Sequence, residues 1–359
     1  MKKIFMILDG PLETDARVLR SLSAAKAAGC LVTIITANTQ ESFETPEDVK
    51  MINLPYLCVG GYKYLKFCLA CIRYFFRMRK SIDVLYMHDY FSTFPGLLLL
   101  PFCKKKKVVY DAHELLLLRE GDYANFRDNF FIWSEKMIVH KVDLIIEANE
   151  EREKVFKDYY HLNNTTNVLN ITQFKGIERR SLTDQHVIVY QGTLTEERNL
   201  SFFIEAIEQI PDAKLLFIGV GRSMEHYKKM VQEKNLEDRV MFTGRLSNKE
   251  MMEKMKEGSI GIISYPFTNM NNIYCSPNKI FEYAAISLPF IATAQPFIKT
   301  VEEKYHIGRT FEFGNIQSFV DNVQEIFNHY DDYNQTEQFL NDYNYEKEFN
   351  KMVSIFETI

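Results

Sequence analysis

The sequence alternates short apolar runs rich in β-branched residues with longer stretches of helical period. Such runs occupy residues 2–8, 31–37, 83–88, 106–114 and 142–149 in the first half, and residues 186–192, 214–221, 239–245, 259–266 and 289–294 in the second. The clearest helical stretches are residues 15–29, which open on the N-cap candidate Asp15 and stop at Gly29, and residues 198–210. Strands that alternate with helices are typical of βαβ units around a parallel sheet. We therefore expect an α/β fold.

The alternation pauses once, at a polar segment over residues 173–185, and then restarts. A chain of 359 residues is long enough to build two separate cores. We expect two Rossmann-like, doubly wound domains over residues 1–175 and 176–335, and a helical tail over residues 336–359 that crosses back to the first domain. Ligands of open parallel sheets bind outside the carboxyl ends of the strands, so two facing domains would form an interdomain cleft lined by strand-end loops.

The cysteines and the chain start favour a cytoplasmic protein. The six cysteines lack the spacing of a disulfide framework, and no apolar run is long enough to span a bilayer. The opening residues MKKIFMILDG predict a first strand rather than a leader, because Asp9 and Gly10 interrupt the apolar run. Cys68 and Cys71 have no second cysteine pair and lie in a helical stretch, so we expect no metal there.

Charge is distributed unevenly, with a net basic N-terminal half and a net acidic C-terminal half. This asymmetry favours an anionic partner for the first domain. A pI near 6.0 and the lack of a recognisable binding motif argue against nucleic acid and favour an anionic lipid surface at the inner face of the membrane. One arc of a helix around residues 62–80 carries basic side chains, which either dock on lipid or form an ordinary solvated face: Lys63, Lys66, Arg73, Arg77 and Lys80.

Residues 274–294, YCSPNKIFEYAAISLPFIATA, carry the most informative pattern. Ser276 predicts a helix N-cap, Pro277 the first helical position, and Asn278 and Lys279 the first turn. Free backbone N–H groups, the helix dipole and the Lys279 charge would suit a diphosphate. Glu282, on the same helix, could accept hydrogen bonds from two vicinal ribose hydroxyls. Alternatively, the helix is structural, and Lys279 and Glu282 only pair with each other.

Two further strand-end loops of the second half place glycine beside a cation. Gly192 follows a strand, and Arg198 is expected to open the next helix, either as a phosphate ligand or as a surface residue paired with a glutamate. Gly244 and Arg245 occupy a similar position in FTGRLS, where Arg245 is equally well explained as an exposed charge. Gly219-x-Gly221 fails as a dinucleotide fingerprint, because residue 224 is a methionine, and predicts a strand-to-helix turn.

In the first half, Gly10 follows the first strand, and two histidines stand at strand ends. His88 is followed by Asp89, and His113 by Glu114. Each histidine alone would most simply be structural, but their occurrence at successive strand ends favours a site.

SPNKIFEYAAISLPFIAT, residues 276–293, strongly resembles the donor-binding stretch of retaining GT-B enzymes of glycosyltransferase family 4, and a looser resemblance extends over about residues 1–330. The resemblance implies a GT-B fold and transfer of a sugar from a UDP- or GDP-sugar, with retention, to a glycan or lipid-linked acceptor in surface polysaccharide synthesis. It implies no cofactor and no metal. The implied roles are catalysis for Arg198, Lys279 and His113; nucleotide-sugar binding for Glu282, Ser276, Pro277, Asn278, Gly192, Gly244, Arg245 and Gly10; and acceptor contacts for His88, Asp89 and Glu114.

The sequence departs from the family pattern at three positions. Tyr274 stands where the family has its first glutamate, Pro277 where it has a glycine, and Thr193 where it has the first of two basic residues. We expect Lys279 to replace the missing cation. A nucleotide-sugar 2-epimerase of the same fold and a catalytically silent GT-B scaffold stay open as alternatives. No Asp-x-Asp triplet, Gly-x-Ser-x-Gly elbow or Walker loop supports other chemistry.

Overall fold

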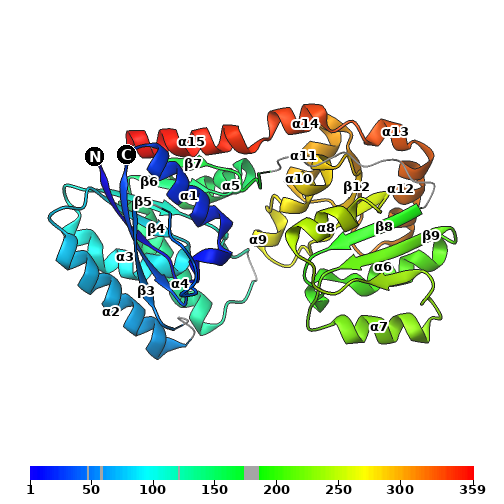
Figure 1. Ribbon diagram of the computed structural model, residues 1–359, viewed down its shortest axis with the longest axis horizontal. Helices are drawn as coiled ribbons and strands as arrows, with labels where there is room; N and C mark the ends of the chain where they lie inside the picture. The colour runs from blue at the N-terminus through cyan, green and yellow to red at the C-terminus, as the bar shows by residue number, and fades with distance from the viewer. Residues whose placement is uncertain (47, 57–59, 120–121, 174–185) are drawn as a thin grey trace. The chain divides into compact units, whose positions relative to one another are not determined.

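The computed structural model describes residues 1–46, 48–56, 60–119, 122–173 and 186–359. The chain divides into two compact units: unit 1 comprises Met1–Asn170 and Tyr345–Ile359, and unit 2 comprises Ile171–Asn344 (Figure 1). The polar segment expected between the domains lies mostly outside the described residues. The tail expected from residue 336 divides at residue 345, because its first helix belongs to unit 2 and its last to unit 1.

Unit 1 is built around a seven-stranded parallel sheet in the order β3-β2-β1-β4-β5-β6-β7. Its strands are β1 (Lys3–Ile7), β2 (Leu31–Ala37), β3 (Val49–Leu54), β4 (Val84–His88), β5 (Lys107–Asp111), β6 (Leu144–Glu147) and β7 (Thr165–Asn167). Its helices are α1 (Ala16–Ala27), α2 (Gly61–Met78), α3 (Thr93–Leu99), α4 (Phe126–Ile138), α5 (Glu150–Tyr160) and α15 (Tyr345–Thr358), with 3-10 turns at Leu12–Thr14, Tyr90–Ser92, Leu100–Phe102 and Val139–Lys141.

Unit 2 contains a six-stranded parallel sheet in the order β10-β9-β8-β11-β12-β13. Its strands are β8 (His186–Gln191), β9 (Ala213–Ile218), β10 (Val240–Phe242), β11 (Ile260–Ile263), β12 (Phe290–Thr293) and β13 (Gly308–Phe311). Its helices are α6 (Leu200–Ala206), α7 (Met224–Glu233), α8 (Asn248–Met255), α9 (Met270–Ile273), α10 (Asn278–Ala285), α11 (Pro296–Tyr305), α12 (Ile316–Asn328), α13 (Tyr330–Tyr333) and α14 (Glu337–Asp342), with 3-10 turns at Glu196–Arg198 and Ile207–Gln209.

Both sheets reverse their strand order once, between β1 and β4 in unit 1 and between β8 and β11 in unit 2. At such a switch point the connections leave in opposite directions, so the carboxyl ends of the two central strands border an open crevice. Topology therefore assigns the candidate site of unit 1 to the ends of β1, β4 and β5. It assigns that of unit 2 to the ends of β8 and β11.

The expected α/β fold class is confirmed. The structure differs from the prediction in its edge strands and in the bounds of one helix. The sequence analysis missed β3, β7 and β13, all of which are edge strands of three to six residues. The helix expected over residues 198–210 is wrong in its bounds. Asn199 adopts a left-handed conformation with φ of 50°, which ends the turn at Arg198 and starts α6 at Leu200.

Helix α1 starts as expected, because the Asp15 side chain accepts a hydrogen bond from the Val18 N–H. Helix α15, from the other end of the chain, lies beside α1 in Figure 1. The Phe356 ring stacks on Tyr86 at 5.4 Å between centroids, and Met352, one turn earlier, is equally buried in the core of unit 1. The C-terminal helix is thus part of the first core, because one face of it fills space beside β4.

No helix in the described part of the chain is both long and apolar enough to cross a membrane.

Phe356→Ala should destabilise unit 1 by about 3–5 kcal/mol, because it removes a buried aromatic ring and leaves a cavity. Urea unfolding followed by the fluorescence of the single tryptophan, Trp133 in unit 1, measures this change. Ser354→Ala, at an exposed position of the same helix, is the matched control and should leave the transition in place. Equal stability of the two variants would show that α15 contributes nothing to unit 1.

Candidate functional site

In unit 2, Tyr265 follows β11 and is held by residues at the end of the neighbouring strand β12. Its N–H donates to Thr293 Oγ1 at 3.0 Å, and its carbonyl accepts a hydrogen bond from Gln295 Nε2 at 2.7 Å. Thr293 and Gln295 in turn hydrogen-bond to each other at 2.7 Å. Tyr265 is thereby fixed at the edge of the sheet where ligands of such folds bind.

Two cations, Arg198 and Lys279, come together on the Tyr265 ring. The Arg198 guanidinium carbon lies 4.1 Å from the ring centroid, and Lys279 Nζ lies 5.6 Å from the same centroid and 5.3 Å from that of Tyr190. The Arg198 carbonyl also accepts a hydrogen bond from Ser264 Oγ at 3.0 Å, which ties its turn to the end of β11. The faces of aromatic rings attract cations, so these contacts gather two positive charges at one strand-end surface.

Gly192, directly after β8, allows Lys279 to approach this surface. It has a φ of 134°, a conformation that other residues rarely adopt, and a Cβ there would come within 3.1 Å of Lys279 Nζ. A side chain at this position would therefore push the ammonium group by a few tenths of an ångström. Glycine at residue 192 is favoured chiefly by the φ of this turn.

Glu282 lies one turn after Lys279 on α10, and its carboxylate accepts a hydrogen bond from the Gln191 side-chain amide at the end of β8. Burial raises the pKa of Glu282, and the Lys279 charge and the Gln191 hydrogen bond offset only part of this rise. Gln191 thus orients the Glu282 carboxylate toward the same strand end that carries the two cations. A carboxylate accepts hydrogen bonds and donates none when ionised, which suits it to hydroxyl groups.

The loops after β8, β9 and β10 pack against one another through their backbones. The Gly219 N–H donates to the Gly244 carbonyl at 3.1 Å, and the Gly192 N–H donates to the Ile218 carbonyl at 2.9 Å. A Cβ at Gly219 would clash with the Gly192 carbonyl. The Gly219-x-Gly221 pattern therefore serves a close approach of loops. Arg245, next to Gly244, is exposed.

The start of α10 corrects one detail of the sequence analysis. Helix α10 begins at Asn278, and the N-cap is Pro277, with φ −66° and ψ 133°, rather than Ser276. A proline favours extended backbone in the residue before it, which keeps Ser276 outside the helix, and the Pro277 carbonyl accepts a hydrogen bond from the Ile280 N–H at 3.1 Å. Pro277 is buried, Ser276 is partly buried and Asn278 is exposed.

In unit 1, a cavity of about 250 Å³ opens at the carboxyl ends of β1, β4 and β5. It is lined by Leu8, Asp9, Gly10, Pro11, Thr14, Asp15, His88, Asp89, Phe91 and His113. Both sequence-predicted histidines, Asp89 and Gly10 therefore face one cavity. Glu114, the remaining acceptor-side candidate, is exposed and does not line it.

A network of buried charges fixes the two histidines. The Arg17 guanidinium donates to Asp111 Oδ1 at 2.6 and 2.8 Å, and the Tyr86 hydroxyl donates to Asp111 Oδ2 at 2.9 Å. His88 Nδ1 lies 3.6 Å from Asp111 Oδ2 and 3.3 Å from His113 Nε2. His113 Nδ1 lies 3.4 Å from Asp15 Oδ2. The chain of contacts from Arg17 to Asp15 holds both imidazoles in place.

Burial and the charges of this network shift the pKa values of the two histidines in opposite directions. Burial tends to lower the pKa of His113, but the hydrogen bond to Asp15 and the charges of Asp111 and Asp89 outweigh burial and raise it. Burial lowers the pKa of His88, against the opposing effect of Asp111. Although burial opposes its ionisation, contact with His113 lowers the pKa of Asp15 to about 2. These opposite shifts favour the positive charge on His113 over His88.

Two of the residues that line this cavity carry buried polar atoms at the strand ends. His88 Nε2 and Asp89 Oδ1 are both buried and have no hydrogen-bond partner among the described residues. Burial raises the pKa of Asp89 to about 6. Two residues at the cavity wall thus hold an imidazole nitrogen and a carboxyl oxygen without a partner among the described residues.

His88, Asp111 and His113 also have ligand-type atoms within 4.8 Å of one another, which raises the question of a metal. The Arg17 guanidinium occupies Asp111 Oδ1, and its positive charge at this distance disfavours a divalent cation. Asp111 is held by Arg17 and Tyr86, and His88 Nδ1 faces His113 Nε2 at 3.3 Å, so these residues do not fit a metal site.

The sequence analysis missed Gln191, Tyr265, Asp111 and Arg17 as site residues and assigned Asp15 only as a helix cap. Gln191 and Asp111 are the last residues of their strands, a position that could have marked them. Arg17 carried no signal, because a charged residue on a helix is normally exposed.

Asp15→Asn should lower the pKa of His113, because it removes the carboxylate that stabilises the imidazolium. Asparagine keeps the helix cap, so the fold should be retained. NMR titration of the His113 ring measures the change. Because the folded pKa lies above the unfolded value of 6.5, the pair stabilises the fold below pH 6.5 and loses this effect as pH rises through the folded pKa. An unchanged His113 titration in the variant would contradict the network.

Two family models match the chain, one in each half. The model described as glycosyl transferases group 1 matches residues 175–341, and the model described as glycosyltransferase family 4 matches residues 16–166. A curated relative, an uncharacterized glycosyltransferase of Methanocaldococcus jannaschii, is 22% identical over 208 residues. The match covers 52% of this chain and 49% of the relative, so the chain spans about half the length of the curated relative that it matches.

Solved structures match over the whole chain at low identity. Sucrose-phosphate synthase from Thermosynechococcus elongatus has a TM-score of 0.79 at 17% identity and covers 99% of this chain and 98% of its own. TarM has a TM-score of 0.74 at 12% identity, with 100% and 99% covered. Anabaena HepE in complex with UDP-glucose has a TM-score of 0.73 at 11% identity, with both chains covered completely. These likenesses establish a two-domain α/β fold of the GT-B type. With the family models on both halves, the chain belongs to glycosyltransferase family 4.

Proposed function

We propose that unit 2 binds a nucleotide diphosphate sugar and that the chain transfers its sugar with retention of configuration. The observation that carries this proposal is the convergence of Arg198, Lys279 and Glu282 at the carboxyl ends of β8 and β11. A diphosphate needs positive charge, and a ribose needs a hydroxyl acceptor beside it. UDP is the first nucleotide to test, because HepE and S. aureus TarM were each solved with UDP.

The proposed roles in unit 2 follow from charge and position. Arg198 and Lys279 stabilise the negative charge that grows on the β-phosphate as the sugar leaves. Glu282 accepts hydrogen bonds from the ribose hydroxyls. The remaining candidates are backbone and loop contacts: Ser276, Pro277 and Asn278 at the start of α10 for phosphate and sugar, Gly192 for the diphosphate, and Gly244 with Arg245 for the base.

The proposed mechanism needs no nucleophile from the protein. The acceptor hydroxyl attacks from the face that the nucleoside diphosphate leaves, and an oxygen of the leaving phosphate takes the acceptor proton. Catalysis then rests on positioning and on electrostatic stabilisation of the leaving group. GDP in place of UDP would leave the roles of the phosphate ligands unchanged.

We propose that the cavity of unit 1 receives the acceptor. His88 Nε2 and Asp89 Oδ1 supply a donor and an acceptor for a hydroxyl, and Gly10 keeps the β1 loop free of a side chain. His113, held as a cation by Asp15, orients the transferred sugar. Glu114, which is exposed and does not line the cavity, is assigned to acceptor contacts outside it.

We further propose a glycan or lipid-linked acceptor, used in polysaccharide synthesis at the cytoplasmic face of a membrane. The support is the exposed basic face of α2, where Lys63, Lys66, Arg73 and Arg77 all reach solvent, with Lys80 just after the helix. Such a face attracts anionic lipid headgroups.

Glu282→Ala should weaken binding of the nucleotide by about 10- to 100-fold, because hydrogen bonds to a charged group contribute about 1.5–3 kcal/mol each. Isothermal titration calorimetry with UDP, GDP and ADP measures this loss and identifies the base. Arg222→Met is the control, because it removes an exposed cation of unit 2 that is not one of the proposed donor ligands. It should bind the nucleotide as tightly as the wild type does. Equal affinity of Glu282→Ala and wild type would reject the ribose role.

Lys279→Met and Arg198→Met should each lower kcat by about 10²- to 10³-fold, the usual cost of removing one electrostatic contact to a developing charge. Initial rates with the UDP-sugar that binds best measure the effect, and NMR of the product reports its anomeric configuration. Both variants should melt at the wild-type temperature, because neither side chain is part of the core. Full activity in both variants, or an inverted product, would contradict the proposed mechanism.

A further inference from the structure

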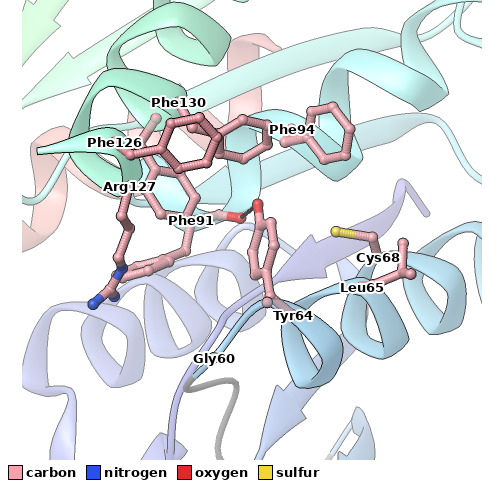
Figure 2. Close-up of a pocket in the computed structure, with 11 residues that line it drawn as sticks. Gly60, Tyr64, Leu65, Cys68, Phe91, Phe94, Phe126, Arg127 and Phe130 are labelled. Atoms are coloured by element: carbon pink, nitrogen blue, oxygen red, sulfur yellow. Dashed lines mark hydrogen bonds between the residues drawn. The ribbon is translucent and has the colours of Figure 1, made fainter.

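An apolar cavity of about 500 Å³ lies in unit 1 between α2 on one side and α3 and α4 on the other, and it shares the lining residue Phe91 with the strand-end cavity. It is lined by Gly60, Gly61, Tyr64, Leu65, Cys68, Phe91, Phe94, Phe126, Arg127, Phe130 and Phe131. Figure 2 shows the rings of Phe94, Phe126 and Phe130 in a row opposite Tyr64, Leu65 and Cys68 of α2. A cavity lined mainly by aromatic rings is suited to a hydrocarbon ligand.

The walls of this cavity are held open by ring packing and one hydrogen bond. The Tyr64 hydroxyl donates to the Phe91 carbonyl at 2.8 Å, which links α2 to the loop after β4 (Figure 2). The Tyr64 and Phe131 rings meet edge to face at 5.3 Å, and those of Phe94 and Phe130 at 5.0 Å. The hollow is therefore a built feature of the fold.

The surface around the cavity is apolar and exposed. Phe126 is 91% exposed at the first position of α4, and Leu65 is 53% exposed on α2. Most exposed large hydrophobic side chains of the described residues lie in this part of unit 1: Tyr62, Leu65, Leu69, Leu98, Phe102, Tyr123, Phe126, Trp133 and Met137. A concentration of this kind marks an interaction surface rather than chance exposure.

The charge beside the cavity is positive. Helix α2 contains no acidic residue, and its exposed Lys66 lies beside Leu69, three residues along the helix. Arg127 lines the cavity itself, with its guanidinium carbon 5.3 Å from the Phe91 ring centroid. A ligand that fits has an apolar chain for the cavity and a negative head for the cations. Both features belong to an anionic membrane lipid.

We propose that this cavity binds one hydrocarbon chain of an anionic membrane lipid, while the basic face of α2 contacts the headgroups. The proposal deepens the membrane association proposed above and does not depend on glycosyl transfer. Basic residues alone give binding that salt screens, and a single buried chain alone gives weak binding, but the two together give stable attachment. The occupant is a lipid rather than a second copy of this chain, because the same α2 face would repel its own positive charge.

Trp133, the single tryptophan, makes the cavity directly observable. Its ring lies 6.0 Å from that of Phe130 and 6.4 Å from that of Phe94, both of which line the cavity. Titration with butyl, octyl and dodecyl phosphate below micelle formation should change the Trp133 emission. Affinity should rise by about fourfold for each added CH₂ group until the cavity is filled. Dodecyl maltoside, which has the same chain and no charge, should bind more weakly.

Leu65→Gln and Phe126→Ser should each weaken dodecyl phosphate binding by at least tenfold, because they remove apolar area at the cavity. Tyr159→Ser, which removes a similarly exposed ring of α5 outside this surface, is the matched control. Lys63→Glu with Lys66→Glu should reduce sedimentation with phosphatidylglycerol vesicles, whereas the matched pair Lys154→Glu with Lys157→Glu on α5 should not. All variants should bind UDP in unit 2 as the wild type does, which separates this test from that of the donor site.

Three results would overturn the proposal. The first is an affinity independent of chain length, which would leave only a phosphate contact. The second is vesicle binding through α2 without any Trp133 response, which would preserve the membrane association and reject the chain site. The third is that the protein does not bind dodecyl phosphate but forms a concentration-dependent dimer, and that Phe126→Ser abolishes this dimer. That result would assign the surface to a second copy of the chain.

Discussion

The proposed donor site depends on two cations held on the ring of one tyrosine. Arg198 and Lys279 repel each other, and the structure stabilises them with the face of the Tyr265 ring and with a glycine that leaves room for the ammonium group. Such contacts are weaker than ion pairs, so the two charges stay available to an anion. Glu282, one turn along α10, accepts a hydrogen bond from Gln191 at the same strand end. In our proposal, the two cations bind a diphosphate and Glu282 binds the neighbouring hydroxyl groups.

The charged groups of unit 1 differ from those of unit 2, because in unit 1 groups of opposite charge are buried in contact with one another. Asp111 is completely buried and has Arg17, Tyr86 and His88 around it, and this environment holds its pKa well below its usual range. Breaking such a buried pair by removing one partner is costly, since it leaves an unpaired charge in the core. The network orients His88 and His113 rigidly at the strand ends. A rigid support of this kind suits a site that must present a hydroxyl in one orientation.

Sequence patterns predicted the parts of this architecture that depend on local chemistry. The central strands, the Asp15 cap, the strand-end positions of His88 and His113, and the placement of Lys279 and Glu282 on one helix all follow from periodicity and turn residues. The short edge strands β3, β7 and β13 were not predicted, because so few residues carry little periodic signal. The residues that hold the site side chains in place were not predicted either. Tyr265 and Arg17 act through contacts made far along the chain, and no local pattern encodes them.

The central claim is that the two cations of unit 2 bind the pyrophosphate of the donor. The most direct measurement is calorimetric comparison of UDP with UMP, which lacks the β-phosphate, on the wild type and on Lys279→Met. The account predicts that UDP binds the wild type at least tenfold more tightly than UMP and that this gap narrows in the variant. Equal affinity for UDP and UMP in the wild type would contradict it.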